Sequence, residues 1–512
     1  MPEPQGVLLT GATGLLGRYL LHDLLLKAHP VTVLVRDSRK GGAVERIAQI
    51  VAFWSERLRR KLPTPVVLNG DLGHAGLGLT AVDRRWLGRH CRTVIHSAAN
   101  LSFRATPEKE PWRTNVDGTK NLLALCQDVG LSEWHQVSTA FVCGQRTGII
   151  AEDDCDYSQG FHNPYEESKC QAERLVRRTP GMRATIYRPA VIVGDSRTGY
   201  TSGFNGLYRF LELGARVASL STAVGGAHMP LRLPLSGDED WNLVSVDWVS
   251  RAIVELLARQ RWHGRTYHLV ARAPVSTRLV RDVGADVLNL PGVDFAGSDH
   301  VDNPSRLEQW FLDGIQEYWP YLGGSPVFAT VNTSAALPDL PPPPVDRSML
   351  ERLIRFAVAS RWGRTPAQTS AVCARSLARS SCAEYIEQVF PRQSRRSSLA
   401  REAGLDLTVC IDLRGPGGGQ WSCKWSQGEM IYARCGLEDG ATVTYHTDAE
   451  TFRAVVSGFQ TPQEAFFDQR IAITGDMETA LKLAVLFGLF LSENPWPRPK
   501  RKEVMYSTTC QP

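Results

Sequence analysis

The chain has 512 residues, with 43% hydrophobic residues, 22% charged residues and a formal net charge of +5. This composition is that of a globular protein of several domains, and so small a net charge gives no reason to expect a nucleic-acid partner. The longest apolar run, near 480–491, contains Lys482 and is too short to be a transmembrane helix. We see no targeting signal, and the scattered cysteines have no metal-ligand spacing, so we expect a cytoplasmic protein with reduced thiols and no metal site.

Residues 7–21 predict a buried strand, a glycine turn and the start of a helix. We expect this unit to bind a dinucleotide, and a strand–turn–helix without a ligand is the alternative. In this pattern Gly11 permits the tight turn, Gly14 lets the backbone approach a pyrophosphate, and Gly17 lets the helix pack closely on the strand. The free N–H groups of the helix start would face the phosphates. The sequence therefore predicts a dinucleotide site that includes Gly11, Thr13, Gly14, Leu15, Leu16 and Gly17.

A second β-rich run, residues 31–35, is followed by a cation rather than by an acid. In NAD-binding enzymes an acidic residue near this strand end binds the ribose 2′-OH, whereas a guanidinium suits a 2′-phosphate. Here Arg36 follows the strand and Asp37 comes one place later. The pattern favours NADPH as the cofactor, and a solvated basic turn is the alternative.

Two further strand-and-turn units follow, at residues 65–72 and 93–100. The first contains Asp71, whose carboxylate could accept a hydrogen bond from an adenine amino group. Together the units predict strands three and four of an alternating α/β domain. The second unit ends in small residues that would let a cofactor lie against the backbone: Ser97, Ala98 and Ala99.

Tyr165 and Lys169 are four residues apart at the start of a predicted helix, so they share a helix face. A neighbouring ammonium favours the phenolate, and we expect it to lower the pKa of Tyr165 below the usual value of about 10. The phenol would then donate a proton to a carbonyl oxygen that gains charge, while Lys169 also holds the nicotinamide ribose. Alone, this spacing is typical of a pair on the surface. Because it follows a glycine-rich turn earlier in the chain, it predicts that Tyr165 and Lys169 are catalytic.

A fifth predicted strand, residues 136–142, carries Ser138 and Thr139. We expect Thr139 to donate a second hydrogen bond to the same substrate oxygen. Thr139 is preferred over Ser138 because successive side chains of a strand point to opposite faces. Asn115, near the start of another predicted helix, either orders a proton-relay water or holds the backbone geometry.

Two aromatic-rich stretches, residues 199–220 and 310–322, either pack in the core or line a lipid-facing pocket. We place a linker at 361–380, after a domain that covers residues 1–360 and includes the substrate-binding part. A C-terminal domain at 381–495 and a basic tail at 496–512 complete the chain. The basic clusters are expected to be solvated, with weak peripheral contact to lipid headgroups as the alternative.

Beyond residue 405 the sequence changes to short alternating runs separated by turns, which is typical of an antiparallel meander. Asp448 is placed to cap a helix. A final apolar helix is predicted from Met477 to Leu491. Its leucines either fill the core of the domain or line a lipid tunnel.

The order of the N-terminal motifs resembles the extended short-chain dehydrogenase/reductase superfamily, and within it the fatty acyl-CoA reductases and thioester reductase domains. The resemblance implies a doubly wound parallel sheet with a small substrate-binding part. It also implies that NADPH reduces an acyl thioester to an aldehyde, and in some members on to an alcohol. The motifs that carry it lie at residues 10–21, 34–36, 70–72, 96–103, 115–119, 137–140, 163–169, 188–189 and 194–199.

The same resemblance implies roles for individual residues. Thr139, Tyr165 and Lys169 would be catalytic, and Arg36 and Arg46 would grip the 2′-phosphate. The cofactor-binding residues not yet assigned above would be Leu72, Asn115, Arg188 and Pro189, with Tyr165 and Lys169 contributing to both functions.

The last fifth of the chain resembles the sterol-carrier-protein family of non-specific lipid-transfer domains. The resemblance rests on residues 418–421, 441–444, 473–476 and 480–483, with Phe452. It implies an α+β fold around an apolar tunnel for an acyl chain or a sterol.

We therefore expect an NADPH-dependent reductase of a long-chain acyl thioester or another lipid, carried by CoA or by an acyl carrier protein, with a fused lipid-binding domain. One alternative is a sterol or hydroxy-lipid dehydrogenase that uses NAD(P). Another is a lipid-transfer protein whose first half only binds the cofactor. The presence of both Tyr165 and Lys169 argues against the last alternative.

Overall fold

A computed structural model describes most of the chain. The described residues are 6–38, 41–154, 158–223, 231–297, 299–363, 381–395, 399–402, 404–468, 470–494 and 496. They fall into two compact units, which comprise residues 1–215 with 229–364, and 216–228 with 365–512. The predicted linker beyond residue 363 and the predicted tail beyond residue 496 lie outside the described residues.

The first unit is built on a seven-stranded sheet in the order β12-β7-β5-β4-β1-β2-β3, in which every pairing is parallel. The central strands are buried on both faces, which explains why they appear as continuous apolar runs in the sequence. The strand order reverses between β1 and β4, so the carboxyl ends of these strands border a ligand crevice. The strands are β1 Gly6–Thr10, β2 Val31–Val35, β3 Val66–Asn69, β4 Cys91–His96, β5 Glu133–Val137, β7 Arg183–Pro189 and β12 Thr266–Leu269.

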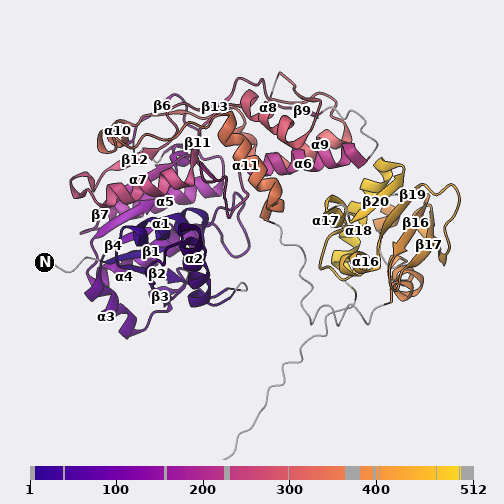
Figure 1. Cartoon of the computed structure of the whole chain (residues 1–512), viewed down its shortest axis with the longest axis horizontal. Helices are drawn as coiled ribbons and strands as arrows, with labels where there is room; N and C mark the ends of the chain where they lie inside the picture. The colour runs from indigo at the N-terminus through magenta and orange to yellow at the C-terminus, as the bar shows by residue number, and fades with distance from the viewer. Residues whose placement is uncertain are drawn as a thin grey trace, which may run out of the picture. The chain divides into compact units, whose positions relative to one another are not determined.

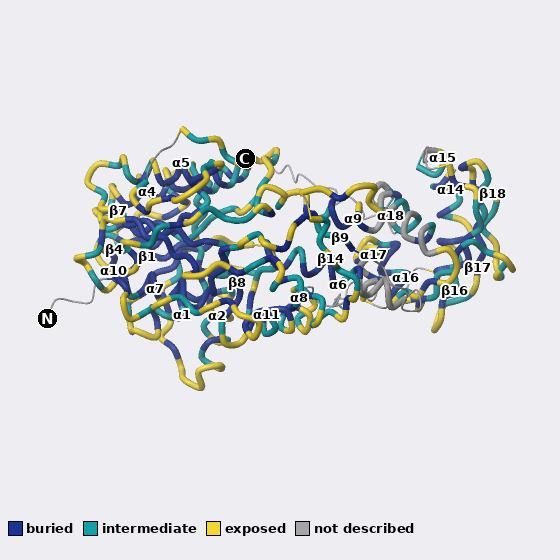
Figure 2. The backbone as a smooth tube through the Cα atoms, turned by 90° about the horizontal axis from the view of Figure 1, so that it is seen from above, coloured by how far each residue is buried: buried dark blue, intermediate teal, exposed yellow. Residues whose placement is uncertain are grey.

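Helices cover both faces of this sheet (Figure 1). Neighbouring side chains of β1 face opposite sides, so Leu9 packs in one apolar cluster and Leu8 in the other. Figure 2 shows α4 and α5 on one side of the buried strands, and α1, α2 and α7 on the other. The helices are α1 Leu15–Leu26, α2 Ala43–Leu58, α3 Ala81–His90, α4 Gly118–Val129, α5 Pro164–Arg178 and α7 Val246–Leu257. The doubly wound fold predicted from the sequence is thereby confirmed.

A smaller part of the first unit is formed after β7, around a separate apolar cluster in which α11 packs on α8. Its strands pair only two by two: β8 with β11, β9 with β14, and β10 with β13, while β6 pairs with β15. Its helices are α6 Leu207–Ala223, of which residues 207–215 belong to this unit, α8 Thr277–Leu288, α9 Arg306–Ile315 and α11 Arg347–Ala359, whereas α10 Val331–Ala336 packs against β12 of the main sheet. The paired strands are β6 Ile149–Ile150, β8 Val191–Val193, β9 Leu231–Leu233, β10 Asp240–Trp241, β11 Leu243–Ser245, β13 Val275–Ser276, β14 Val293–Phe295 and β15 Val327–Phe328.

The second unit has a five-stranded mixed sheet in the order β18-β17-β16-β19-β20. The predicted meander is correct for the first three strands, but β19 runs parallel to β16, so a purely antiparallel sheet was wrong. Alternation reveals a strand but not its partner, and here the chain returns from β18 to the far edge of β16. The strands are β16 Leu407–Arg414, β17 Gly419–Ser426, β18 Glu429–Cys435, β19 Val443–Asp448 and β20 Ile471–Gly475.

Helices of the second unit close an aromatic-rich core over this sheet. Tyr385 stands beside Phe390, Phe452 and Trp496 within it. Asp448 caps its helix as predicted, by accepting a hydrogen bond from the Thr451 amide at 2.7 Å. The helices are α13 Cys382–Glu384, α14 Phe390–Ser394, α15 Leu399–Glu402, α16 Ala449–Val456, α17 Pro462–Phe467 and α18 Met477–Glu493.

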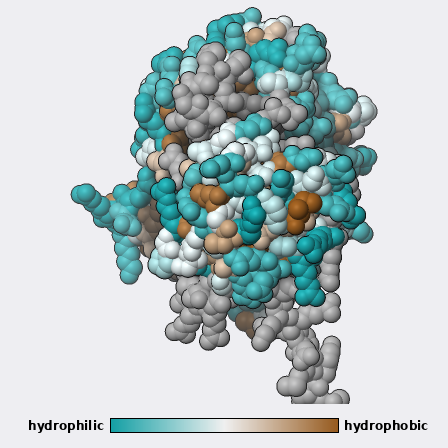
Figure 3. Space-filling model, turned by 90° about the vertical axis from the view of Figure 1, so that its right-hand side faces the viewer, coloured by the Kyte–Doolittle hydropathy of each residue, from teal (hydrophilic) through white to brown (hydrophobic). Residues whose placement is uncertain are grey.

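The described surface has no extended apolar face in the view of Figure 3, where hydrophobic residues appear as small separate spots among hydrophilic ones. Within the described ranges, no helix combines the length and the apolar character needed to cross a bilayer. Isolated exposed apolar residues of this kind are normal on globular proteins.

Candidate active site

The glycine turn between β1 and α1 has the geometry of a phosphate cradle. Gly11 has a φ of +76°, and a Cβ there would lie 2.6 Å from the Ala98 amide nitrogen. A Cβ on Gly17 would lie 1.9 Å from the Gly11 carbonyl oxygen. Gly14 is the N-cap of α1 and offers no side-chain cap, so the N–H groups of the first turn remain available to a ligand. The residues present therefore fit a dinucleotide pyrophosphate.

A buried chain of hydrogen bonds fixes β1 against β4 beneath this turn. Thr119 Oγ1 donates to the Asn115 carbonyl oxygen at 2.6 Å, so it accepts from His96 Nε2 at 3.1 Å. His96 Nδ1 then accepts from Thr10 Oγ1 at 2.7 Å, and Thr10 accepts from the Ala98 amide at 3.3 Å. Burial, and next the charge of Lys169, lower the pKa of His96 to about 3, so the ring stays neutral. The sequence patterns gave Thr10 and Thr119 no role.

At the end of β2 the structure brings Arg36, Arg46 and Asp71 together. Arg46 Nη1 donates to the Arg36 carbonyl oxygen at 2.8 Å, and Arg36 Nη1 lies 3.7 Å from Asp71 Oδ2. The Asp37 carboxylate is occupied by the turn, because it accepts from the Ala43 amide at 2.7 Å and from Asn69 at 2.9 Å. The same two hydrogen bonds hold the pKa of Asp37 below its usual value. The Arg36 side chain is 66% exposed and is thus available to an anion.

The remaining residues predicted at the cofactor site lie in or after the turns that follow β1, β3 and β4. The Thr13 carbonyl oxygen accepts from Arg18 Nε at 3.1 Å, and the Leu72 carbonyl oxygen accepts from Asn121 at 2.8 Å. Leu16 is buried in the apolar cluster behind the turn, while Leu15 packs against that cluster from its edge. Ser97, Ala98 and Ala99 are partly exposed directly after β4.

Thr139 and Tyr165 meet at the carboxyl end of β5. A hydrogen bond joins their side chains, and Thr139 Oγ1 lies 3.5 Å from the Pro189 carbonyl oxygen. Tyr165 is placed by the start of α5, where Asn163 caps the helix by accepting from the Glu166 amide at 3.1 Å. Ser138 instead lies against Glu173, as the alternation of strand side chains predicts.

The pKa of Tyr165 differs from the one expected from the sequence. Burial and the neighbouring Glu166 carboxylate raise the pKa of Tyr165, although the Thr139 hydrogen bond opposes the shift. The expected lowering of the Tyr165 pKa by Lys169 was therefore wrong. Lys169 Nζ donates to the Val137 carbonyl oxygen at 2.6 Å, and burial lowers the pKa of Lys169 to about 8. The predicted proton donor is thus a phenol whose burial and carboxylate neighbour keep it neutral.

Asn115 holds backbone geometry, which was one of its two predicted roles. Its Oδ1 accepts from the Asn100 amide at 2.8 Å, and its Nδ2 donates to the Asn100 carbonyl oxygen at 3.0 Å. Nδ2 also donates to Ser168 Oγ at 2.9 Å, and Ser168 in turn donates to the Tyr165 carbonyl oxygen at 2.8 Å. Asn115 therefore links the segment after β4 to the helix that carries Tyr165.

Arg188 is held inside the protein by a buried bidentate ion pair. Its Nε and Nη2 donate to the two Glu173 carboxylate oxygens at 2.9 and 2.8 Å, and Nη2 also donates to the Asp154 carbonyl oxygen at 3.0 Å. Burial alone would raise the pKa of Glu173, but the charge of Arg188 and its hydrogen bonds lower this pKa to about 2. This arrangement ties β7 to α5 behind the site. The cofactor role predicted for Arg188 stays a prediction, whereas Pro189 borders Thr139 directly.

Partly exposed aromatic rings surround Tyr165. The ring of Phe103 lies 6.1 Å from that of Tyr165, 5.5 Å from that of Tyr318 and 5.6 Å from that of Tyr321. Phe141 stands edge-on to Tyr321 at 5.3 Å. These rings offer an apolar wall beside the reacting groups.

Glu166 anchors this wall, and no sequence pattern pointed to it. The Tyr321 hydroxyl donates to Glu166 Oε1 at 2.5 Å and accepts from Asn163 Nδ2 at 2.6 Å. The His162 amide donates to Glu166 Oε2 at 3.0 Å, and the hydrogen bond between Glu166 and the His162 ring raises the pKa of His162. The carboxylate next to Tyr165 is thus fully occupied by neighbouring donors.

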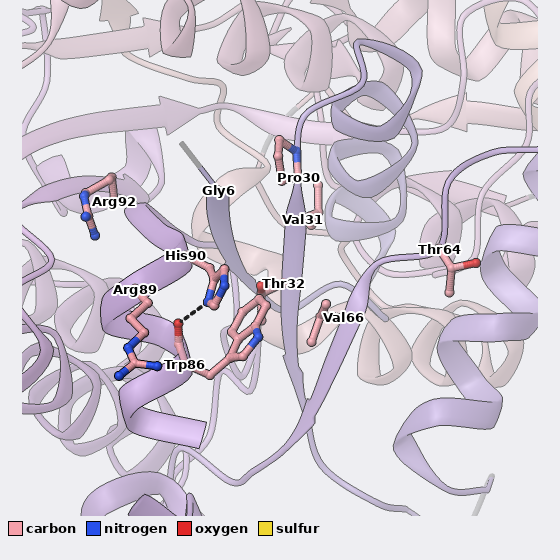
Figure 4. A pocket seen from close by; sticks show the side chains of 10 residues that line it. All are labelled: Gly6, Pro30, Val31, Thr32, Thr64, Val66, Trp86, Arg89, His90 and Arg92. Atoms are coloured by element: carbon pink, nitrogen blue, oxygen red, sulfur yellow. Dashed lines mark hydrogen bonds between the residues drawn. The ribbon is translucent and has the colours of Figure 1, made fainter. Parts of the chain in front are cut away.

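A hollow of about 410 Å³ lies elsewhere, at the amino ends of the first strands (Figure 4). It is separate from the predicted site, since none of the predicted residues lines it. Its wall contains stacked rings of Trp86 and His90, and His90 Nδ1 bonds to the Trp86 carbonyl oxygen at 2.8 Å. The lining residues are Gly6, Pro30, Val31, Thr32, Thr64, Val66, Trp86, Arg89, His90 and Arg92.

Comparison with known families gives one match in each unit. Residues 9–253 match the family described as male sterility protein, whose model is that of an NAD-binding domain. Residues 386–488 match the SCP-2 sterol transfer family. The two matches account separately for the doubly wound sheet and for the mixed sheet of the second unit.

Individual relatives match the first part of the chain. The chain is 29% identical over 335 residues to the L-2-aminoadipate reductase large subunit of Penicillium chrysogenum, covering 60% of this chain and 22% of that protein. It is 25% identical over 393 residues to the aldehyde reductase lnaA of Aspergillus flavus, covering 68% of this chain and 36% of that protein. The chain thus spans little more than a third, at most, of these curated relatives.

A solved structure supports the same relationship. The terminal R domain from the myxalamid PKS-NRPS biosynthetic pathway is 28% identical to this chain, with a TM-score of 0.58. The similarity covers 71% of this chain and 92% of that domain.

Proposed function

We propose that the chain reduces acyl thioesters to aldehydes with NADPH, because residues 9–253 match the male sterility protein family and residues 386–488 match the SCP-2 sterol transfer family. Its first unit is an oxidoreductase domain of the thioester reductase type. The observation that carries the proposal is the meeting of Thr139 and Tyr165 at the carboxyl end of β5, the same edge of the parallel sheet at which the glycine turn follows β1.

The preference for NADPH rests on the end of β2. Arg36 presents an exposed guanidinium there, and Arg46 is tied to the same backbone. Asp37, the acid that would otherwise accept from a ribose hydroxyl, is committed to the Ala43 amide and to Asn69. A cationic strand end matches the doubly charged 2′-phosphate better than it matches a hydroxyl.

The reduced nicotinamide, when bound, supplies the hydride. The hydroxyls of Thr139 and Tyr165 would both donate to the thioester carbonyl oxygen, so that they stabilise the negative charge that develops on it. Tyr165 would transfer its proton to that oxygen, which gives a hemithioacetal. The C–S bond of the hemithioacetal would then break as its hydroxyl proton passes to the departing sulfur, so that the thiol leaves and the aldehyde C=O bond forms. Lys169 lies one helical turn further along and, when protonated, offsets the charge left on the phenol. The balanced reaction consumes one thioester, one NADPH and one proton, and releases aldehyde, thiol and NADP⁺.

The substrate would bring a long apolar chain. The partly exposed rings of Phe103, Phe141 and Tyr321 offer it a wall next to Tyr165. The SCP-2 unit, with its aromatic core, would hold the chain before or after reduction. Since the myxalamid R domain comes from a PKS-NRPS pathway, a carrier-protein thioester is a donor to test alongside CoA.

We further assign the protein to the cytoplasm. The eight described cysteines form no disulfide, and seven of them are buried. Reduced thiols of this kind are typical of a reducing compartment that also maintains NADPH.

The test is turnover of the full-length chain with NADPH and acyl thioesters of several lengths, on CoA and on a carrier protein, with analysis of aldehyde and alcohol. Aldehyde formation that requires Tyr165 supports the proposal. No turnover with any thioester, together with oxidation of a sterol or secondary alcohol by NADP⁺, would instead favour a hydroxy-lipid dehydrogenase. Lipid binding without any redox turnover would assign the chain to lipid transfer.

A further inference from the structure

Three potential metal ligands converge at the amino end of β5, far from the glycine turn. Glu133 and His135 lie two residues apart on the strand, and His263 lies just before β12. Their ligand atoms all lie within 4.8 Å of one another, and the two imidazole rings stand edge-to-face at 4.7 Å. Since His263 is 130 residues away from Glu133, spacing in the sequence gave no sign of this group.

The hydrogen bonds of His263 leave a nitrogen lone pair facing a carboxylate. Nε2 lies 3.1 Å from the carbonyl oxygens of both Leu256 and Leu257, so it carries the proton and donates. In the neutral ring, Nδ1 then has a lone pair, and it lies 3.0 Å from Glu133 Oε2. Two lone pairs at this distance require a cation between them, or else a second proton on the ring.

His135 supplies the observation that favours a metal over a proton. The residue is fully buried, and its Nδ1 lies 2.7 Å from the Tyr187 hydroxyl. Its Nε2 has no hydrogen-bond partner among the described residues. A buried polar nitrogen without a partner is costly, and a bound cation would satisfy it.

We propose that Glu133, His135 and His263 bind a Zn²⁺ ion. Two imidazoles and one carboxylate are a donor set that Zn²⁺ favours, with water as the fourth ligand. Tyr187 and the carbonyl oxygens of Leu256 and Leu257 hold the far sides of the two rings, as outer partners do in zinc proteins. Glu133 is 28% exposed, so the ion and its water can reach the group from solvent.

The surroundings define what the ion would do. Arg183 faces the group and pairs with the other Glu133 oxygen at 3.4 Å, which leaves Oε2 to the metal. The Gly264 amide donates to Thr185 Oγ1 at 2.9 Å, so the loop that carries His263 is already held against β7. Thr139 follows the opposite end of β5. The ion would therefore cross-link β5 to the segment before β12 and stabilise the sheet, without touching the reacting groups.

The test measures zinc binding by the full-length chain after chelation and dialysis. Titration calorimetry and elemental analysis should give one Zn²⁺ per chain. Binding should weaken at least tenfold in His263→Gln and Glu133→Gln, and should be unchanged in His90→Gln, which alters an exposed histidine elsewhere. Less than one equivalent in the unaltered chain, or equal binding by all variants, would overturn the assignment.

Glu133→Gln keeps the experiment decisive if His263→Gln does not fold, because Glu133 is partly exposed and the substitution keeps its shape. Zn²⁺ should raise the Tm of the unaltered chain by several degrees and leave the Tm of Glu133→Gln unchanged. An equal rise in both would show that the ion binds elsewhere. Reductase turnover with saturating substrate should not differ between the unaltered chain and Glu133→Gln.

Discussion

The two ends of the parallel sheet carry polar groups of opposite character. At the carboxyl end, the hydroxyls of Thr139 and Tyr165 meet, and the start of α1 has no side-chain cap, so its first N–H groups are available to a ligand. At the amino end, His135 and His263 have their outer nitrogens bound to Tyr187 and to backbone carbonyl oxygens. These contacts suit reversible ligand binding at the carboxyl end and stabilisation of the fold at the amino end. Substitutions at the first should change turnover, and those at the second should change stability.

The largest effect on turnover is expected from Tyr165→Phe. Because the phenol is the proposed proton donor, its loss should lower kcat/KM for an acyl thioester by about 100- to 10,000-fold. Steady-state NADPH oxidation measures this loss, and Tyr445→Phe in the second unit serves as a matched control. The Tm of Tyr165→Phe should differ from that of the unaltered chain by no more than about two degrees. A Tyr165→Phe protein with near-normal kcat/KM would remove Tyr165 from the chemistry and with it the contrast between the two ends.

The next effect concerns cofactor choice. Arg36→Ala removes the exposed guanidinium at the end of β2, and charge-assisted hydrogen bonds of this kind contribute about 1.5–3 kcal/mol. The KM for NADPH should therefore rise about 10- to 100-fold, while the KM for NADH changes little. Arg89→Ala, at the amino end of the sheet, should alter neither constant. Equal rises for both cofactors would show that Arg36 acts on the fold and not on the 2′-phosphate.

The pH dependence gives a third test through Lys169, whose pKa burial lowers to about 8. If the ammonium is the active form, kcat/KM should fall about tenfold per pH unit above pH 8, because one proton is lost. A pH profile that stays flat to pH 10 would separate Lys169 from catalysis.

The same pKa fixes the sign of a stability change. Since the folded chain releases this proton near pH 8 and the unfolded chain near the ordinary 10.5, the unfolded state binds more protons between these values. Between about pH 8 and pH 10.5 the Tm of the unaltered chain should therefore rise with pH relative to the Tm of Lys169→Met. A fall relative to that variant would contradict the lowered pKa.

The smallest effect is expected in the second unit. Phe487 on α18 packs against the core of this unit while staying partly exposed. Phe487→Ser should weaken retention of a long-chain acyl probe by about three- to tenfold, through lost apolar contact. Turnover of a short soluble thioester should be unchanged. Ile431→Ser, on exposed β18, is the control, and equal loss in both variants would argue against a lipid site at α18.

Local patterns were enough to predict the doubly wound fold, whereas the roles of the site residues that they indicated stay predictions. The apolar run before Gly11, the glycine spacing and the helical spacing of Tyr165 and Lys169 all depend on neighbours in the sequence. The same is true of Arg36 and Asp37, whose order at the strand end is visible without a structure.

The residues that were missed depend on contacts between distant segments. Thr10 meets His96 across 86 residues, and Tyr321 reaches Glu166 across 155. No periodicity in the sequence shows such pairs. The pKa of Tyr165 was mispredicted for the same reason, because it depends on burial and on Glu166 as well as on the residue one helical turn away. The parallel pairing of β19 with β16 is likewise a choice between partners that alternation leaves open.

The central claim is hydride delivery to a thioester carbonyl carbon at Thr139 and Tyr165, and isotope transfer tests it most directly. The full-length chain is given an acyl thioester and NADPH with deuterium at the transferable position of the nicotinamide. We expect an aldehyde with deuterium on its carbonyl carbon, formed in the same amount as the released thiol. Thiol release without aldehyde, or an aldehyde without deuterium, would contradict it.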